Sequence, residues 1–187
     1  MRWLVLIILA FAAVLVQVTI GGLLRFRGLG IGSIGPDLVA MIAVFIAMYA
    51  RWGADAMLSA WVLGLALDLT AAGGAGSETA VGPMPIASVL AAWLVYRIRG
   101  AFFRERVLAQ MVLALAFCAV AHGTWVMLQC AVSHSYTTWA VCGQLLFQAL
   151  ALSIYTAVLM PIAHMALSRA QKLFMAGPPG RARRGAS

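Results

Sequence analysis

Two aspartates, Asp37 and Asp68, are the residues best suited to acid–base chemistry, because each lies beside or within a strongly apolar stretch. Two carboxylates at one depth of a membrane domain can activate water, as in intramembrane aspartyl proteases. Asp37, however, follows Pro36 at the start of an apolar run, and Pro-Asp is typical of the first turn of a helix. We therefore expect Asp37 to cap a helix, and we expect the chain not to be an enzyme.

Other chemically active groups are scattered along the chain, and it has no G-x-S-x-G nucleophile motif. The histidines fall at different depths without a metal-binding spacing such as H-E-x-x-H; they are His122, His134 and His164. The cysteines form no C-x-x-C pair, and we interpret them as small buried apolar residues; they are Cys118, Cys130 and Cys142. We expect no metal and no cofactor. We interpret His122 as a packed core histidine, with a ligand or a proton relay as the alternative.

The surroundings of Asp68 predict a contact between helices. Asp68 lies in the apolar run Ala54–Ala72, and Ala56, Ala60 and Gly64 precede it at steps of four. On a helix this spacing places three small residues and one carboxylate on a single stripe. A charge in hydrocarbon costs about 3 kcal/mol, whereas small residues let a second helix approach closely. We expect Asp68 to face the bundle interior and to be hydrogen-bonded, with a glutamine of another span as the candidate partner.

A second stripe of small residues occurs at Ala149, Ser153 and Ala157, followed by Pro161. It predicts either packing within the bundle or an interface for a helix of another protein. For the second case, it is our first candidate for the binding face, with the third and fourth spans as the alternative.

These residues must be positioned by membrane helices, because 64% of the chain is hydrophobic and only 10% is charged. A helix needs about 20 apolar residues to cross a bilayer. The apolar runs predict an all-α integral membrane protein with six spans, at 3–24, 37–50, 54–72, 79–96, 107–132 and 139–167. Residues 1–168 then form a six-helix transmembrane bundle, and residues 169–187 form a basic tail that we expect to be disordered.

The placement of basic residues predicts the orientation. With both termini inside, eleven of the thirteen Lys and Arg residues fall in inner segments, and only Arg25 and Arg27 fall outside. This satisfies the positive-inside rule for a multi-pass protein of a cytoplasmic membrane. The net charge of +8 then reflects orientation and contact with anionic lipid of the bilayer, and we expect no nucleic-acid partner.

In this topology, polar residues concentrate in the outer halves of the spans; they are Gln17, Asp37, Asp68, Gln129, Gln144 and Gln148. This distribution indicates either a polar cavity near the outer face or glutamines that each bond a neighbouring backbone.

Several short motifs resemble the rod shape-determining protein MreD family of bacterial inner-membrane proteins. They are Pro36-Asp37-Leu38, Tyr49-Ala50-Arg51-Trp52-Gly53, Gly64-Leu65-Ala66-Leu67-Asp68-Leu69, Gly82 and Tyr96-Arg97-Ile98-Arg99, with Met160-Pro161 in the last span. The resemblance covers residues 36–106, about two fifths of the chain. Gly73–Pro85 departs from the shorter, Leu-rich connection that the family leads us to expect.

The resemblance implies a non-enzymatic component of the cell-wall elongation machinery, which directs peptidoglycan synthesis and cell shape. Its partner would be an MreC-like protein with one membrane helix. The pair would link an MreB-like filament to the RodA glycosyltransferase and a penicillin-binding transpeptidase. The family's fold is similar to the substrate-binding subunits of energy-coupling-factor transporters.

That shared fold gives the alternative function, a small-molecule-binding subunit of an energy-coupling-factor type transporter. Such subunits typically dock through Ala-x-x-x-Ala on the first helix. In this chain Ala10, Ala12 and Ala13 have no alanine four residues later. The short loops also offer few aromatic and polar groups for recognising a ligand. The scaffold is therefore the favoured interpretation.

Overall fold

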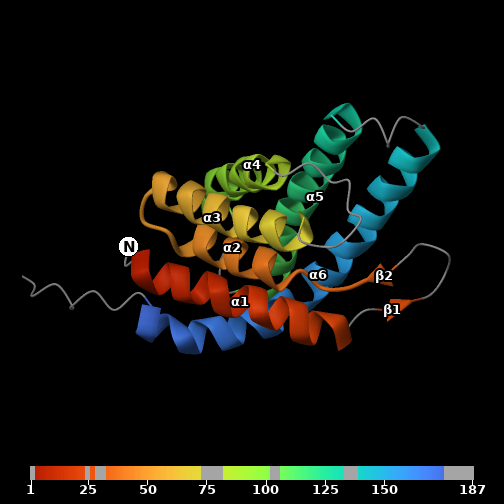
Figure 1. Ribbon diagram of the computed structural model, residues 1–187. Coiled ribbons are helices and arrows are strands. Elements are labelled where there is room, and N and C mark those ends of the chain that lie inside the picture. Colours follow the sequence, from red (N-terminus) through yellow and green to blue (C-terminus); the bar gives the residue numbers. More distant parts are fainter. Residues whose placement is uncertain are drawn as a thin grey trace, which may run out of the picture.

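Six α-helices occur in the described residues, and each overlaps one of the spans that the hydropathy pattern predicts (Figure 1). The computed structural model describes residues 3–23, 26–27, 33–72, 82–101, 106–132 and 139–174. Its helices are α1 (Trp3–Leu23), α2 (Leu38–Tyr49), α3 (Gly53–Ala72), α4 (Pro83–Ile98), α5 (Val107–Val132) and α6 (Trp139–Phe174). Two strands of two residues, β1 (Phe26–Arg27) and β2 (Ser33–Ile34), pair antiparallel, and a 3₁₀ turn, Arg99–Ala101, follows α4. The helical architecture of the prediction is thus confirmed.

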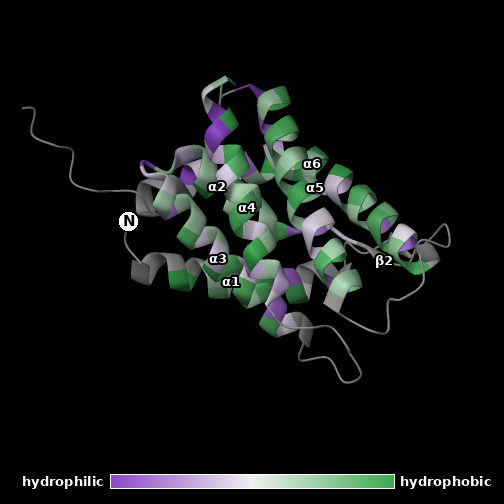
Figure 2. Cartoon of the chain, turned by 90° about the horizontal axis from the view of Figure 1, so that it is seen from above, coloured by the Kyte–Doolittle hydropathy of each residue, from purple (hydrophilic) through white to green (hydrophobic). Residues whose placement is uncertain are grey.

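Three of these helices, α3, α5 and α6, are long and apolar enough to cross a membrane, which gives the chain the character of an integral membrane protein. Their apolar windows are Gly53–Thr70, Val107–Ala131 and Val141–Arg169, and shorter apolar stretches occur at Ala10–Thr19 and Leu38–Tyr49. Figure 2 shows hydrophobic residues along most of the length of the helices. Whether α1, α2 and α4 also cross the membrane stays a prediction.

The short helix α2 lies at the centre of the bundle, where it contacts each of the other five helices described. Every residue from Val39 to Met48 is buried. A helix that is apolar on all sides is stable only when it is surrounded. Its 12 residues span about 18 Å, less than a bilayer core, so other elements must satisfy both of its ends within the protein.

Small residues bring α3 and α4 into close contact. Ala56 and Ala60 of α3 are fully buried, as are Ala87 and Ala91 of α4. A Cβ added at Gly64 would lie 2.6 Å from Ser88 Oγ, and 2.9 Å from backbone atoms of Met84 and Pro85. The stripe that ends at Asp68 therefore does face a neighbouring helix.

The second stripe also lies inside the bundle, since Ala149, Ser153 and Ala157 are at most 9% exposed. The Ser153 hydroxyl donates a hydrogen bond to the Ala149 carbonyl of its own helix. The sequence allowed either packing within the bundle or an interface for a helix of another protein. The structure shows packing within the chain. They are not available to a helix of another protein.

The far end of the α5–α6 hairpin corrects the interpretation of the cysteines. Cys130 and Cys142 form a disulfide, with their Cα atoms 6.4 Å apart, whereas Cys118 is a buried free thiol as predicted. Figure 1 shows this end at the upper right, away from the end where α1 begins and α6 finishes.

The boundary of the tail needs a second correction. The helix α6 continues to Phe174, so the residues directly after position 168 are helical rather than disordered. The remainder of the predicted tail, 175–187, lies outside the described residues.

Candidate functional site: the polar contacts around α2

Asp37 caps the start of α2 from a buried position. Its Oδ1 accepts a hydrogen bond of 2.8 Å from the backbone N–H of Ala40, which is one of the unpaired donors of the first turn. The backbone N–H of Asp37 donates to Thr156 Oγ1 of α6 at 3.1 Å. Asp37 is thus the helix cap that the sequence predicts, and it also ties α2 to α6.

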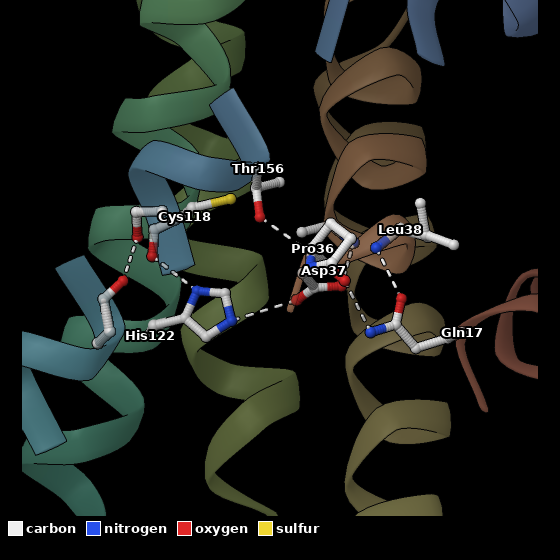
Figure 3. Close-up of polar contacts among 10 residues, drawn as sticks. Gln17, Pro36, Asp37, Leu38, Cys118, His122 and Thr156 are labelled. Atoms are coloured by element: carbon white, nitrogen blue, oxygen red, sulfur yellow. Dashed lines mark hydrogen bonds and ion pairs between the residues drawn. The ribbon is translucent and has the colours of Figure 1, made fainter. Parts of the chain in front are cut away.

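Gln17 of α1 forms hydrogen bonds with the backbone of the two residues that flank Asp37 (Figure 3). Its Nε2 donates to the carbonyl of Pro36 at 3.0 Å, and its Oε1 accepts from the N–H of Leu38 at 2.8 Å. One amide side chain therefore satisfies two backbone groups at a buried helix start, where water cannot do so. This supports the backbone-bonding interpretation of the glutamines at this position.

His122 of α5 completes the site from the other side (Figure 3). Its Nε2 lies 3.2 Å from Asp37 Oδ2, and its Nδ1 lies 2.9 Å from the carbonyl oxygen of Cys118. The two side chains are 13% and 6% exposed, so solvent screens their interaction weakly. His122 is thus the packed core histidine that we expected, but its pairing with Asp37 was not predicted from the sequence. The sequence signal for this pairing is that both residues lie within or beside apolar spans.

Asp68 caps a different helix. Its Oδ2 accepts hydrogen bonds from the N–H groups of Gly82 at 2.8 Å and Met84 at 3.1 Å, at the start of α4. Gly82 precedes α4 and has a φ of 121°, a conformation that favours glycine. Pro83 follows it at the first helical position. The prediction that Asp68 is buried and hydrogen-bonded is confirmed. The partners described for Asp68 are backbone donors of a helix end, in place of the glutamine that was the candidate partner.

Arg99 closes the opposite end of α2. Its Nη1 donates to the carbonyls of Ala47, Met48 and Ala50 at 2.7–3.1 Å. Its guanidinium also lies 3.9 Å from the centre of the Tyr96 ring. A cation complements the negative end of a helix and satisfies its free carbonyls. Together, Asp37 and Arg99 supply charges of the favourable sign to the two ends of α2.

The polar residues predicted for the outer halves of the spans make different contacts. Gln17 and Asp37 meet at the start of α2, Asp68 lies at the start of α4, and Gln144 is exposed. Across the described residues, every buried side-chain nitrogen or oxygen has a hydrogen-bond partner. No three His, Cys, Asp or Glu side chains among those residues lie close enough together to hold a metal ion. The geometry holds helices together through internally satisfied polar contacts.

No protein-family model, curated protein or solved structure matches the chain.

Proposed function

We propose that this chain is a non-enzymatic membrane scaffold of the bacterial cell-wall elongation machinery, of the MreD type, which binds an MreC-like partner and helps determine cell shape. The observation that carries the proposal concerns the residues on which the family resemblance rests. Several of them take part in contacts that hold the helices in place. The contacts involve Asp37 at the start of α2, Arg99 at its end, Gly53 beside Tyr96, Gly64 against α4, and Asp68 with Gly82.

These contacts support a scaffold more than a binding subunit. A ligand site presents several polar groups that converge on one space and await a partner. Here the buried polar groups of the described residues are already paired, and they join α2 to α1, α4, α5 and α6. A bundle fixed in this way presents a constant outer surface, which suits assembly with other membrane helices.

The partner would dock through the membrane, since the described residues are helical apart from short connections. With the α6 stripe buried, the alternative face on α3 and α4 becomes our candidate. Its exposed large side chains include Leu58, Trp61, Leu90 and Trp93. Packing of such side chains against a single-span helix would drive association in lipid. The MreB-like filament, the RodA glycosyltransferase and the penicillin-binding transpeptidase would then be reached indirectly, through the MreC-like partner.

The disulfide supports the proposed orientation in a bacterial inner membrane, with both termini in the cytoplasm. Disulfides persist in oxidising compartments such as the bacterial periplasm. Cys130 is near the end of α5 and Cys142 is near the start of α6, and Figure 1 shows these parts of the two helices away from the start of α1 and the end of α6. A periplasmic location of the disulfide would put the start of α1 and the end of α6 on the cytoplasmic side, in agreement with the distribution of basic residues.

Co-purification with an MreC-like single-span protein tests the proposal. The native chain should retain the partner, and the double variant Trp61→Ala, Trp93→Ala should lose most of it while still inserting. Phe11→Ala, which removes an exposed aromatic side chain from α1, is the matched control and should retain the partner. If the native chain fails to bind the partner while a vitamin-sized ligand raises its melting temperature, the transporter-subunit function is favoured instead.

A further inference from the structure

We propose that Asp37 and His122 form a buried proton-binding site, which locks α5 to the start of α2 while the proton is bound. This inference goes beyond the scaffold function, and it does not depend on the identity of any protein partner. It rests on the positions of two acceptor atoms around one imidazole ring, Asp37 Oδ2 and the Cys118 carbonyl oxygen, and on the elements that these atoms belong to.

The hydrogen-bonding pattern requires an extra proton. The Cys118 carbonyl can only accept a hydrogen bond, so Nδ1 of His122, at 2.9 Å, must carry a hydrogen. A neutral imidazole has a single N–H, which leaves a lone pair on Nε2. That lone pair would face Asp37 Oδ2 at 3.2 Å, and an ionised carboxylate has only lone pairs to offer. Both contacts of the ring are attractive together only when one more proton lies on the imidazole or on the carboxyl group.

Other hydrogen bonds hold Asp37 and the His122 ring in these positions, so the two groups cannot easily turn away from each other when the extra proton is absent. Asp37 Oδ1 is already used by the N–H of Ala40, and the Asp37 backbone is held by Thr156. Flipping the His122 ring would exchange Nδ1 for carbon and break the bond to its own helix. The proton therefore decides whether α5 is joined to α2 at this point.

The neighbouring elements contribute mainly neutral groups. From α1 comes the amide of Gln17, from α6 the hydroxyl of Thr156, and from α5 the thiol of Cys118. Cys118 also interacts electrostatically with Asp37, and ionising it would add a second negative charge. Loss of the proton from the pair thus leaves a buried negative charge opposite a lone pair, which is costly in a medium of low dielectric constant.

The stability of the folded protein should consequently depend on pH in a defined direction. In the unfolded chain, water solvates a neutral imidazole and a carboxylate separately, and neither needs the shared proton. The contact therefore stabilises the folded state most at mildly acidic pH, and this stabilisation is lost as the pH rises through the range in which histidine titrates.

Thermal unfolding of the purified protein in nanodiscs, between about pH 5.5 and pH 8.5, tests the proposal. The melting temperature of the native chain should fall by a few degrees across this range. Asp37→Asn is the decisive variant. Asparagine keeps a cap acceptor for Ala40, and its N–H₂ can donate to the lone pair of a neutral His122, so no proton is needed. Its melting temperature should no longer fall as the pH rises over the same range.

His164→Gln is the matched control, because His164 is also titratable and bonds to Tyr49 at the other end of α2. This variant should keep the pH dependence of the native chain. A dependence that persists in Asp37→Asn, or that vanishes in His164→Gln, would overturn the proposal. A native chain whose melting temperature does not change with pH would overturn it as well.

Discussion

At the scale of single residues, Asp68 is a carboxylate on one helix that caps another. Asp68→Ala leaves the N–H groups of Gly82 and Met84 unpaired in a buried place, so stability should fall by about 1–3 kcal/mol. Asp68→Asn should lose less, because its side-chain oxygen can still accept from both donors. Unfolding in detergent measures the difference.

Thr70→Ala is the control for Asp68, since Thr70 lies on the same helix and its exposed hydroxyl bonds only to carbonyls of α3 in the contacts described. It should change stability little. Equal losses for Asp68→Ala and Thr70→Ala would mean that the cap does not hold α4.

Gly64 tests the closeness of α3 and α4. The added methyl group of Gly64→Ala would meet Ser88 Oγ at 2.6 Å and the backbone of α4 at 2.9 Å, so the two helices must separate. We expect a clear loss of thermal stability. Gly123→Ala adds the same methyl group to α5 where nothing lies within 4 Å, and it should be neutral or stabilising because alanine favours helix by about 1 kcal/mol. The opposite order of the two variants would contradict the close helix contact.

At the scale of elements, α2 depends on neighbours at both ends. Arg99→Ala removes the donor to three carbonyls at its C-terminal end and should destabilise the chain. Arg99→Lys should rescue only part of the loss, because an ammonium group lacks the planar fork of guanidinium. Hydrogen exchange of the last turn of α2 should report the change.

Arg97→Ala is the matched control, because Arg97 is exposed in the last turn of α4, two residues before Arg99. Faster exchange in α2 for Arg99→Ala than for Arg97→Ala would support the capping role. Indistinguishable exchange in the two variants would refute it.

The helices themselves could be predicted from the sequence because apolar run length is a local property, and Pro36-Asp37 marks a helix start by its own chemistry. The partners of the polar side chains could not. Asp37 meets His122, and Asp68 meets backbone amides of α4, so both contacts depend on which helices are neighbours. Hydropathy carries no such information. The pairing of Cys130 with Cys142 was missed for the same reason, because it requires the ends of α5 and α6 to meet.

At the scale of the whole molecule, two independent properties support the proposed orientation in the membrane. Basic residues are concentrated in the segments assigned to the inside, and the disulfide joins helix ends on the other side. A Cys118→Ser background keeps this disulfide and leaves no free thiol in the chain. In whole cells, an impermeant maleimide should not label this background until a reductant is added.

Single cysteines introduced into that background then report on which side of the membrane each segment outside the predicted spans lies. Ala75→Cys and Ser135→Cys should be labelled from outside, whereas Phe102→Cys and Gly180→Cys should be labelled only after the membrane is opened. This result is expected because the inner assignment places eleven basic residues on the side where they are retained during insertion. Labelling of Phe102→Cys in intact cells would mean that the bundle has the opposite orientation. The Asp37 and Asp68 sites would then no longer be assigned to the outer half of the membrane.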